Sequence, residues 1–158
     1  IRANLQVDDD PAHWAVAGLS NGGTCAMQVV TRSPGVYRTF LAISAEEHPS
    51  LGSVERTISQ GFGGDRAAYE ANDPLSLMSS APPGRYDGIA GIVSVGRQDT
   101  SYRGAVPVLA EAATRAGMTV STRQYDGAHT WAVWGPALAD QLDWLGGRLG
   151  IASPSPAS

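Results

Sequence analysis

A pentapeptide near the start of the chain contains the residue best placed for covalent chemistry. It reads Gly18-Leu19-Ser20-Asn21-Gly22, a G-x-S-x-G motif between an apolar run (residues 13–17) and a segment with helical spacing. A sharp turn between a strand and a helix lifts a serine hydroxyl clear of a sheet and places the Asn21 N–H where it can help hold an oxyanion. Both motif glycines are expected to be required, because side chains there would collide. This context favours a serine nucleophile over a glycine-rich turn with an uninvolved serine.

A serine nucleophile needs a general base, and the sequence offers three histidines. His13 precedes the first expected strand, so we expect it at the amino edge of the sheet as a surface or capping residue. His48 follows the second expected strand and His129 follows the fourth, which places both at the carboxyl edge. His129, in the loop just before the last helix, is the preferred base. His48 as the base and a purely structural histidine are the alternatives.

The base in turn needs an acid to orient it. Asp99 follows the third expected strand, and the chain order Ser20, Asp99, His129 is that of α/β-hydrolases. A turn or helix-capping aspartate is the alternative for Asp99. The pair Glu46-Glu47, after the second strand, is a second candidate acid. It could also be a solvated loop, or an acidic rim that favours a cationic or amino-bearing substrate.

Three further side chains could serve the site or the core. Trp131 and Trp134 flank the His129 loop and could wall an acyl pocket, although such residues also pack helices on sheets. Trp131, Glu46 and Glu47 are therefore the candidate substrate-binding residues. Cys25 lies one turn into the helix behind Ser20 and is expected to be a small buried hydrophobe.

Strands and helices must alternate to position these residues. Apolar runs predict strands at 13–17, 38–44, 88–95 and 118–125, and helical spacing predicts helices at 21–32, 53–60, 65–71, 103–116 and 132–149. The last helix places Leu138, Leu142, Leu145 and Leu149 on one face. This alternation implies an α/β fold, with a mainly parallel sheet and helices on both faces. Residues 1–150 form one expected domain, and residues 151–158 read as a disordered Ser/Pro tail.

Composition excludes several other classes of protein. The 158 residues are 42% hydrophobic and 16% charged, which excludes a coiled coil and charge-driven disorder. A net charge of −4 without a basic stripe argues against a nucleic-acid partner. No apolar run is long enough to span a membrane. The single cysteine excludes an internal disulfide and a Cys-based zinc site, and all 11 basic residues are Arg, which excludes lysine-based catalysis.

The chain resembles the esterase family of α/β-hydrolases that includes esterase D (S-formylglutathione hydrolase), feruloyl esterases, enterochelin esterases and the antigen 85 mycolyltransferases. The resemblance runs from about Trp14 to Leu149. It rests on WAVAGLSNGG, FLAIS, GFGGDRAAYEANDP, VGRQD and GAHTWAVWGPAL, the last being the most specific. It is weaker for antigen 85, whose acid is typically Glu and whose elbow lacks the second glycine.

The resemblance implies a serine esterase that acts on a small-molecule ester through an acyl-enzyme, with Ser20, Asp99 and His129 as its triad and with no cofactor. An acyltransferase of the antigen 85 type and a non-catalytic hydrolase-like binding domain are the alternatives. Members of the family carry roughly four more strands before the nucleophile, one of whose loops supplies a second oxyanion N–H.

The strands that the family carries before the nucleophile are expected to be missing from this chain. We expect it to be the carboxyl-terminal part of a longer protein, or to have its sheet completed by another chain, because its first strand would otherwise leave an apolar edge exposed. The chain begins with Ile1 and no signal peptide opens it. Related actinobacterial-looking proteins are often exported, so an extracellular or cell-envelope location is expected.

Overall fold

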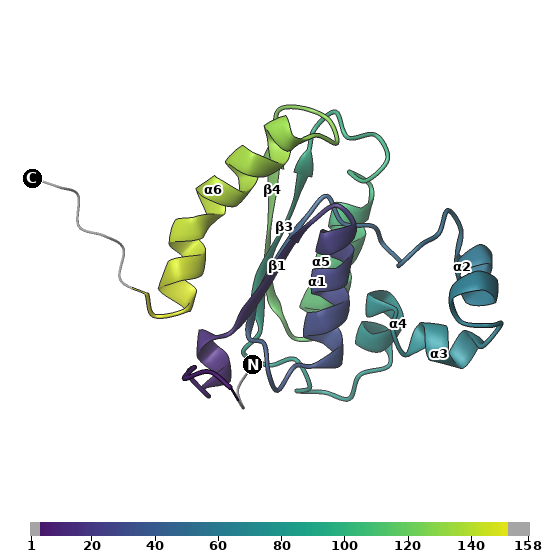
Figure 1. The fold of residues 1–158 in the computed structure, drawn as a ribbon, viewed down its shortest axis with the longest axis horizontal. Helices are drawn as coiled ribbons and strands as arrows, with labels where there is room; N and C mark the ends of the chain where they lie inside the picture. The colour runs from purple at the N-terminus through teal and green to yellow at the C-terminus, as the bar shows by residue number, and fades with distance from the viewer. Residues whose placement is uncertain (1–3, 152–158) are drawn as a thin grey trace, which may run out of the picture.

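The computed structural model describes residues 4–151, and the expected Ser/Pro tail from residue 152 onward lies outside the described residues. Strands and helices alternate along the chain (Figure 1). Their bounds are η1 (Pro11–His13), β1 (Ala15–Leu19), α1 (Asn21–Arg32), β2 (Thr39–Ile43), α2 (Val54–Gly61), α3 (Arg66–Glu70), α4 (Pro74–Ser79), β3 (Ala90–Gly96), α5 (Ala105–Arg115), β4 (Thr119–Tyr125) and α6 (Trp131–Arg148).

The four strands form one parallel sheet in the order β1-β2-β3-β4. Central strands β2 and β3 are buried along their whole length, whereas edge strands β1 and β4 are partly exposed. Helices α1 and α5 cover one face of the sheet and α6 covers the other (Figure 1). The predicted α/β architecture, with helices on both faces, is therefore confirmed. All strand carboxyl ends meet at one edge, where reactive side chains of parallel sheets gather.

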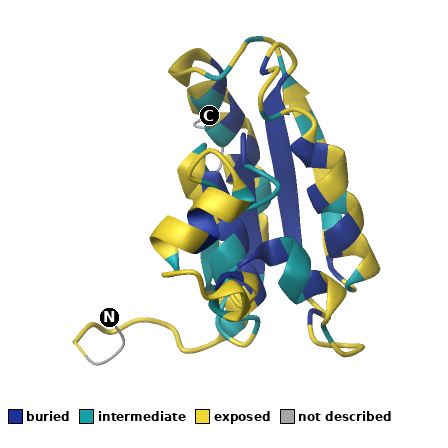
Figure 2. Cartoon of the chain, turned by 90° about the vertical axis from the view of Figure 1, so that its right-hand side faces the viewer, coloured by how far each residue is buried: buried dark blue, intermediate teal, exposed yellow. Residues whose placement is uncertain are grey.

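The main hydrophobic core lies between the sheet and the helices α1, α4 and α5. Its fully buried side chains include Met27, Val30, Phe40, Val93 and Leu109. Figure 2 shows the buried strands enclosed by helices whose outer faces are exposed. Burial of this apolar surface is the main free-energy source for the fold and makes the sheet a rigid platform.

Helix α6 confirms the predicted long helix but buries a different face from the predicted one. Its buried residues are Val133, Ala137 and Gln141, whereas Leu142 is 51% exposed. The Gln141 side-chain amide donates to Ser94 Oγ at 3.0 Å and to the Tyr125 hydroxyl at 3.2 Å. The sheet therefore offers acceptors to the buried amide nitrogen of Gln141, whereas its carbonyl oxygen Oε1 has no hydrogen-bond partner among the described residues.

One further expectation is wrong, and one helix was not expected. Cys25 is exposed rather than buried, because α1 turns Gly23, Thr24, Ala26 and Met27 toward the core instead. Helix α4 was not predicted from the sequence. Its signal was Asp73-Pro74, because the Asp73 carboxylate caps the helix by accepting from Ser76 N at 3.0 Å and proline is favoured in a first helical turn.

Within residues 4–151, none of the helices has the length and apolar character needed to cross a membrane.

Candidate active site

Ser20 lies on the turn between β1 and α1 in a strained backbone conformation. Its φ of 54° and ψ of −125° are unusual for a residue with a side chain. The turn is held by a hydrogen bond from Ser20 N to Ile43 O on β2 at 2.8 Å. Ser20 thus lies at the carboxyl edge of the sheet.

The glycines around Ser20 are not equivalent, which corrects the expectation that both motif glycines are required. A Cβ on Gly18 would lie 1.9 Å from Gly22 O, and a Cβ on Gly23 would lie 2.8 Å from Ile43 O. A Cβ on Gly22 would meet no atom within 4 Å. The close approaches of backbone to backbone therefore require Gly18 and Gly23, but not Gly22.

Ser20, His129 and Asp99 form a continuous hydrogen-bonded chain. Ser20 Oγ lies 2.7 Å from His129 Nε2, and His129 Nδ1 lies 2.7 Å from Asp99 Oδ2. The three residues come from the β1–α1 turn, the β3–α5 loop and the β4–α6 loop, each just beyond the carboxyl end of a strand. The Asp99 side chain is only 1% exposed, which strengthens its interaction with an imidazolium. This geometry allows His129 to accept the Ser20 proton while Asp99 orients the ring.

The loops that carry the acid and the base are tied together. Gln98 N donates to Gly127 O at 2.9 Å, and Arg97 N donates to Tyr125 O at 2.8 Å. The second carboxylate oxygen of Asp99 accepts from Tyr102 N at 3.2 Å. The turn-capping alternative for Asp99 is therefore compatible with its contact to His129, because each carboxylate oxygen has one role.

The Asn21 N–H is available at the start of α1. Within the described part of the chain it has no hydrogen-bond acceptor, as expected for a first-turn donor of a helix. The positive end of the helix dipole lies at the same point. An oxyanion formed at a carbonyl carbon bonded to Ser20 Oγ would be favoured there.

Two aromatic rings hold the imidazole of His129. Tyr102 stacks on it, with ring centroids 4.3 Å apart and 23° between the planes. Trp134 contacts it edge-on at 4.8 Å, and the Trp134 indole donates to Ser44 Oγ at 3.2 Å. Neither Tyr102 nor Ser44 was predicted as a site residue, because both reach His129 and Trp134 only through the tertiary fold. Trp131 contacts only Trp134 among aromatic rings of the described residues and is 71% exposed at the rim.

Glu46 and Glu47 line a separate cavity of about 460 Å³ beside the triad, together with His48 and Tyr102. Glu46 accepts a long hydrogen bond from the Tyr102 hydroxyl (3.4 Å), and its own N–H donates to Thr24 Oγ1. Burial first, and the Glu46 carboxylate second, raise the pKa of Tyr102, which keeps its hydroxyl protonated. The carboxylate bonded to His129 is that of Asp99, not of Glu46.

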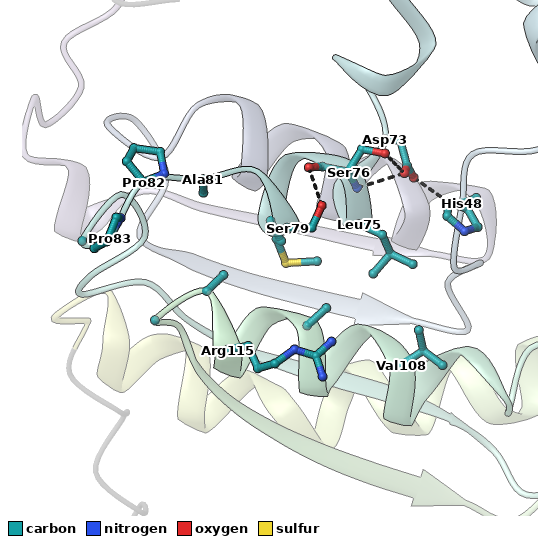
Figure 3. A pocket seen from close by; sticks show the side chains of 15 residues that line it. His48, Asp73, Leu75, Ser76, Ser79, Ala81, Pro82, Pro83, Val108 and Arg115 are labelled. Carbon is teal, nitrogen blue, oxygen red and sulfur yellow. Dashed lines mark hydrogen bonds and ion pairs between the residues drawn. The ribbon is translucent and has the colours of Figure 1, made fainter. Parts of the chain in front are cut away.

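His48 does not contact Ser20 but pairs with Asp73, 2.9 Å from Nδ1 to Oδ1. Asp73 is buried, and its other oxygen also accepts from Ser76 Oγ at 2.7 Å. His48 lines the end of a second cavity of about 790 Å³ between α4 and α5, with Leu75 and Val108 on its walls (Figure 3). The structure thus assigns His48 to a structural pair next to two cavities, and His129 to Ser20.

No group of three or more His, Cys, Asp or Glu side chains within residues 4–151 is arranged to hold a metal ion.

Comparison with known proteins places this chain in a family. A family model described as "Putative esterase" matches residues 1–145. An uncharacterized protein of Corynebacterium glutamicum is 37% identical over 154 residues, which are 96% of this chain and 36% of that protein. The chain belongs to this esterase family.

Solved structures agree on the fold. A ferulic acid esterase superposes with a TM-score of 0.72 at 24% identity, covering 94% of this chain and 56% of that one. An S-formylglutathione hydrolase from Agrobacterium tumefaciens superposes with a TM-score of 0.74 at 24% identity, covering 94% and 53%. The fold is therefore that of α/β-hydrolases. The chain spans about a third of the curated relative and about half of these solved chains.

Proposed function

We propose that this chain carries the nucleophile, base and acid of a serine esterase. The observation that supports the proposal most directly is the unbroken chain of contacts from Ser20 Oγ through His129 to the buried Asp99 carboxylate. This arrangement is built on a strained turn, which orients Ser20 toward the site. The membership of the esterase family points to the same reaction class.

The reaction would proceed in two steps. Ser20 Oγ attacks the ester carbonyl carbon while its proton passes to His129 Nε2, and the carbonyl oxygen becomes an oxyanion held in part by Asn21 N–H. The tetrahedral intermediate then expels the alcohol, which takes the proton from His129 and leaves an acyl group on Ser20. A water molecule repeats the sequence, releases the carboxylic acid and restores Ser20.

We propose that the site takes a second oxyanion donor from outside this chain. Among the described strands, β1 pairs only with β2, so no described strand covers its other edge. The known relatives are longer than this chain. We propose that further residues of the same protein, or another chain, pair with the β1 edge and supply that donor.

We propose that the cavity beside Tyr102 receives one side of the ester, with Trp131 at the rim. Glu46 and Glu47 lie in its lining, and none of the described residues lining it is Arg. Such a lining favours an amino-bearing group over an anionic one. Comparison of kcat/KM for two esters of equal size, one with a terminal ammonium and one with a neutral methyl group, tests this preference, and an equal ratio in wild type and E47Q would contradict it.

An acyltransferase would use the same residues and differ only in the second substrate. Addition of increasing concentrations of an alcohol during turnover separates the two activities. A transferase forms the new ester in preference to free acid, whereas a hydrolase releases mostly acid.

The direct test of the proposed function is labelling of the intact natural protein with a fluorophosphonate, with the adduct mapped by mass spectrometry. We expect one adduct on Ser20 that is lost after heat denaturation and in S20A. A folded protein that gives no Ser20 adduct would contradict an assembled esterase site. Such a result would favour a non-catalytic binding domain.

A further inference from the structure

Tyr102 contacts two members of the candidate triad at once. Its backbone N–H donates to Asp99 Oδ1 at 3.2 Å, while Asp99 Oδ2 contacts His129. Its phenol ring covers one face of the His129 imidazole at a centroid distance of 4.3 Å. A single residue on the β3–α5 loop therefore fixes the acid through its backbone and the base through its side chain.

The stacking geometry suits a positively charged imidazole. The two planes differ by 23°, so the imidazole lies over the electron-rich face of the phenol rather than beside its edge. Cations are attracted to such a face by about 0.5–2 kcal/mol. The Glu46 carboxylate, 3.4 Å from the Tyr102 hydroxyl, makes the ring more electron-rich and adds negative charge behind it.

We propose that Tyr102 is a positioning residue. It holds the Asp99 carboxylate and the His129 imidazole in position relative to each other, and it stabilises the imidazolium that forms when Ser20 gives up its proton. The catalytic benefit rests on the proposed esterase function, whereas the effect on His129 does not. Glu46 acts on His129 through Tyr102, so Glu46 has a role besides lining the cavity.

Among the groups around His129, Tyr102 is the one that can stabilise the imidazolium from the face of the ring. Asp99 contacts the imidazole at Nδ1 and Ser20 contacts it at Nε2. Trp134, from α6, approaches nearly perpendicular to the ring, at 87°. The exposed Asp126 of the same loop pairs with Arg97, so its charge is compensated. Within the described residues, Tyr102 is therefore the residue stacked on the imidazole face and Glu46 the carboxylate behind it.

The test is an NMR titration of the His129 imidazole in the intact natural protein, with its signal assigned as the one lost in H129Q. Loss of the ring in Y102L should move the His129 midpoint to lower pH by about 0.4–1.5 units, from the cation–π energy at 1.36 kcal/mol per unit. Y102F keeps the ring and should shift it less than half as far. E46Q should shift it more than E47Q, which removes an equal charge from the same cavity without the Tyr102 contact.

A purely structural role for Tyr102 would leave the midpoint in place. Unchanged midpoints in both Y102L and E46Q would overturn the proposal, even if wild type hydrolyses esters normally. Conversely, an inactive wild type with the expected shifts would overturn the esterase function and retain the role of Tyr102. Should Y102L not fold, E46Q against E47Q decides the proposal, because both substitutions keep the ring and the loop backbone.

Discussion

A methyl group on Gly18 would lie 1.9 Å from the carbonyl oxygen of Gly22, whereas a methyl group on Gly22 would have no atom within 4 Å. Position 18 therefore requires glycine, because the backbone carbonyl of Gly22 leaves no room for a side chain there. Gly22 itself has room for a side chain, and the second steric requirement falls on Gly23, which lies against Ile43 of β2.

This asymmetry predicts opposite effects of two alanine substitutions. G18A should lower the free energy of unfolding by about 3 kcal/mol or more, because two backbone segments would have to separate. G22A should leave it unchanged or raise it by up to about 1 kcal/mol, because alanine is the better helix former. Urea denaturation measures both, and equal losses in the two variants would contradict the prediction.

Asp99 and Glu46 should differ sharply in their effect on turnover. D99N keeps the size of the side chain but no longer stabilises the imidazolium or the required tautomer, so kcat should fall by about 10³–10⁴-fold. E46Q should lower it by less than about tenfold, because Glu46 acts on His129 only through Tyr102. Steady-state hydrolysis of a p-nitrophenyl ester compares them. A larger loss in E46Q would identify Glu46 as the acid.

Helix α6 provides a prediction about stability. V133A removes buried apolar groups and should cost about 2 kcal/mol of unfolding free energy. L142A should cost under about 1 kcal/mol, because Leu142 is 51% exposed. Thermal or urea unfolding of both variants tests which face of the helix is buried, and a larger loss in L142A would contradict the structure.

His13, near the amino edge of the sheet, should titrate above the ordinary histidine range. Its Nδ1 lies 2.5 Å from Asp8 Oδ2, and this hydrogen bond raises the pKa of His13. The folded state therefore favours protonated His13. The stabilisation is complete below the unfolded pKa of about 6.5 and is lost as the pH rises through the higher folded value.

An NMR titration checks this linkage. D8N should move the His13 midpoint down toward its ordinary value, because the charged acceptor is gone. D65N, which alters the cap of α3 instead, serves as the matched control and should leave His13 unchanged. A His13 midpoint that D8N does not move would contradict the assigned pair.

Much of the fold was accessible from the sequence because its signals are local. The turn residues around Ser20 and the helical spacing after it predicted α1 with the bounds that the structure has, Asn21–Arg32. The alternation of apolar runs and helical segments predicted a parallel sheet. Because all parallel strands end at the same edge, the sequence alone also predicted that Ser20, Asp99 and His129 would lie close together.

Tertiary structure decided which side chains actually meet. Helical spacing offered Leu138, Leu142, Leu145 and Leu149 as a buried face, but the docking of α6 across the sheet buried Gln141, which finds Ser94 and Tyr125 there. The stacking of Tyr102 on His129 joins two loops that are distant in sequence, and the close approach of Gly23 to Ile43 joins α1 to the neighbouring strand β2. The spacing of apolar residues indicates the secondary structure of a single segment. The residues that each side chain contacts depend on where the other segments lie in the fold.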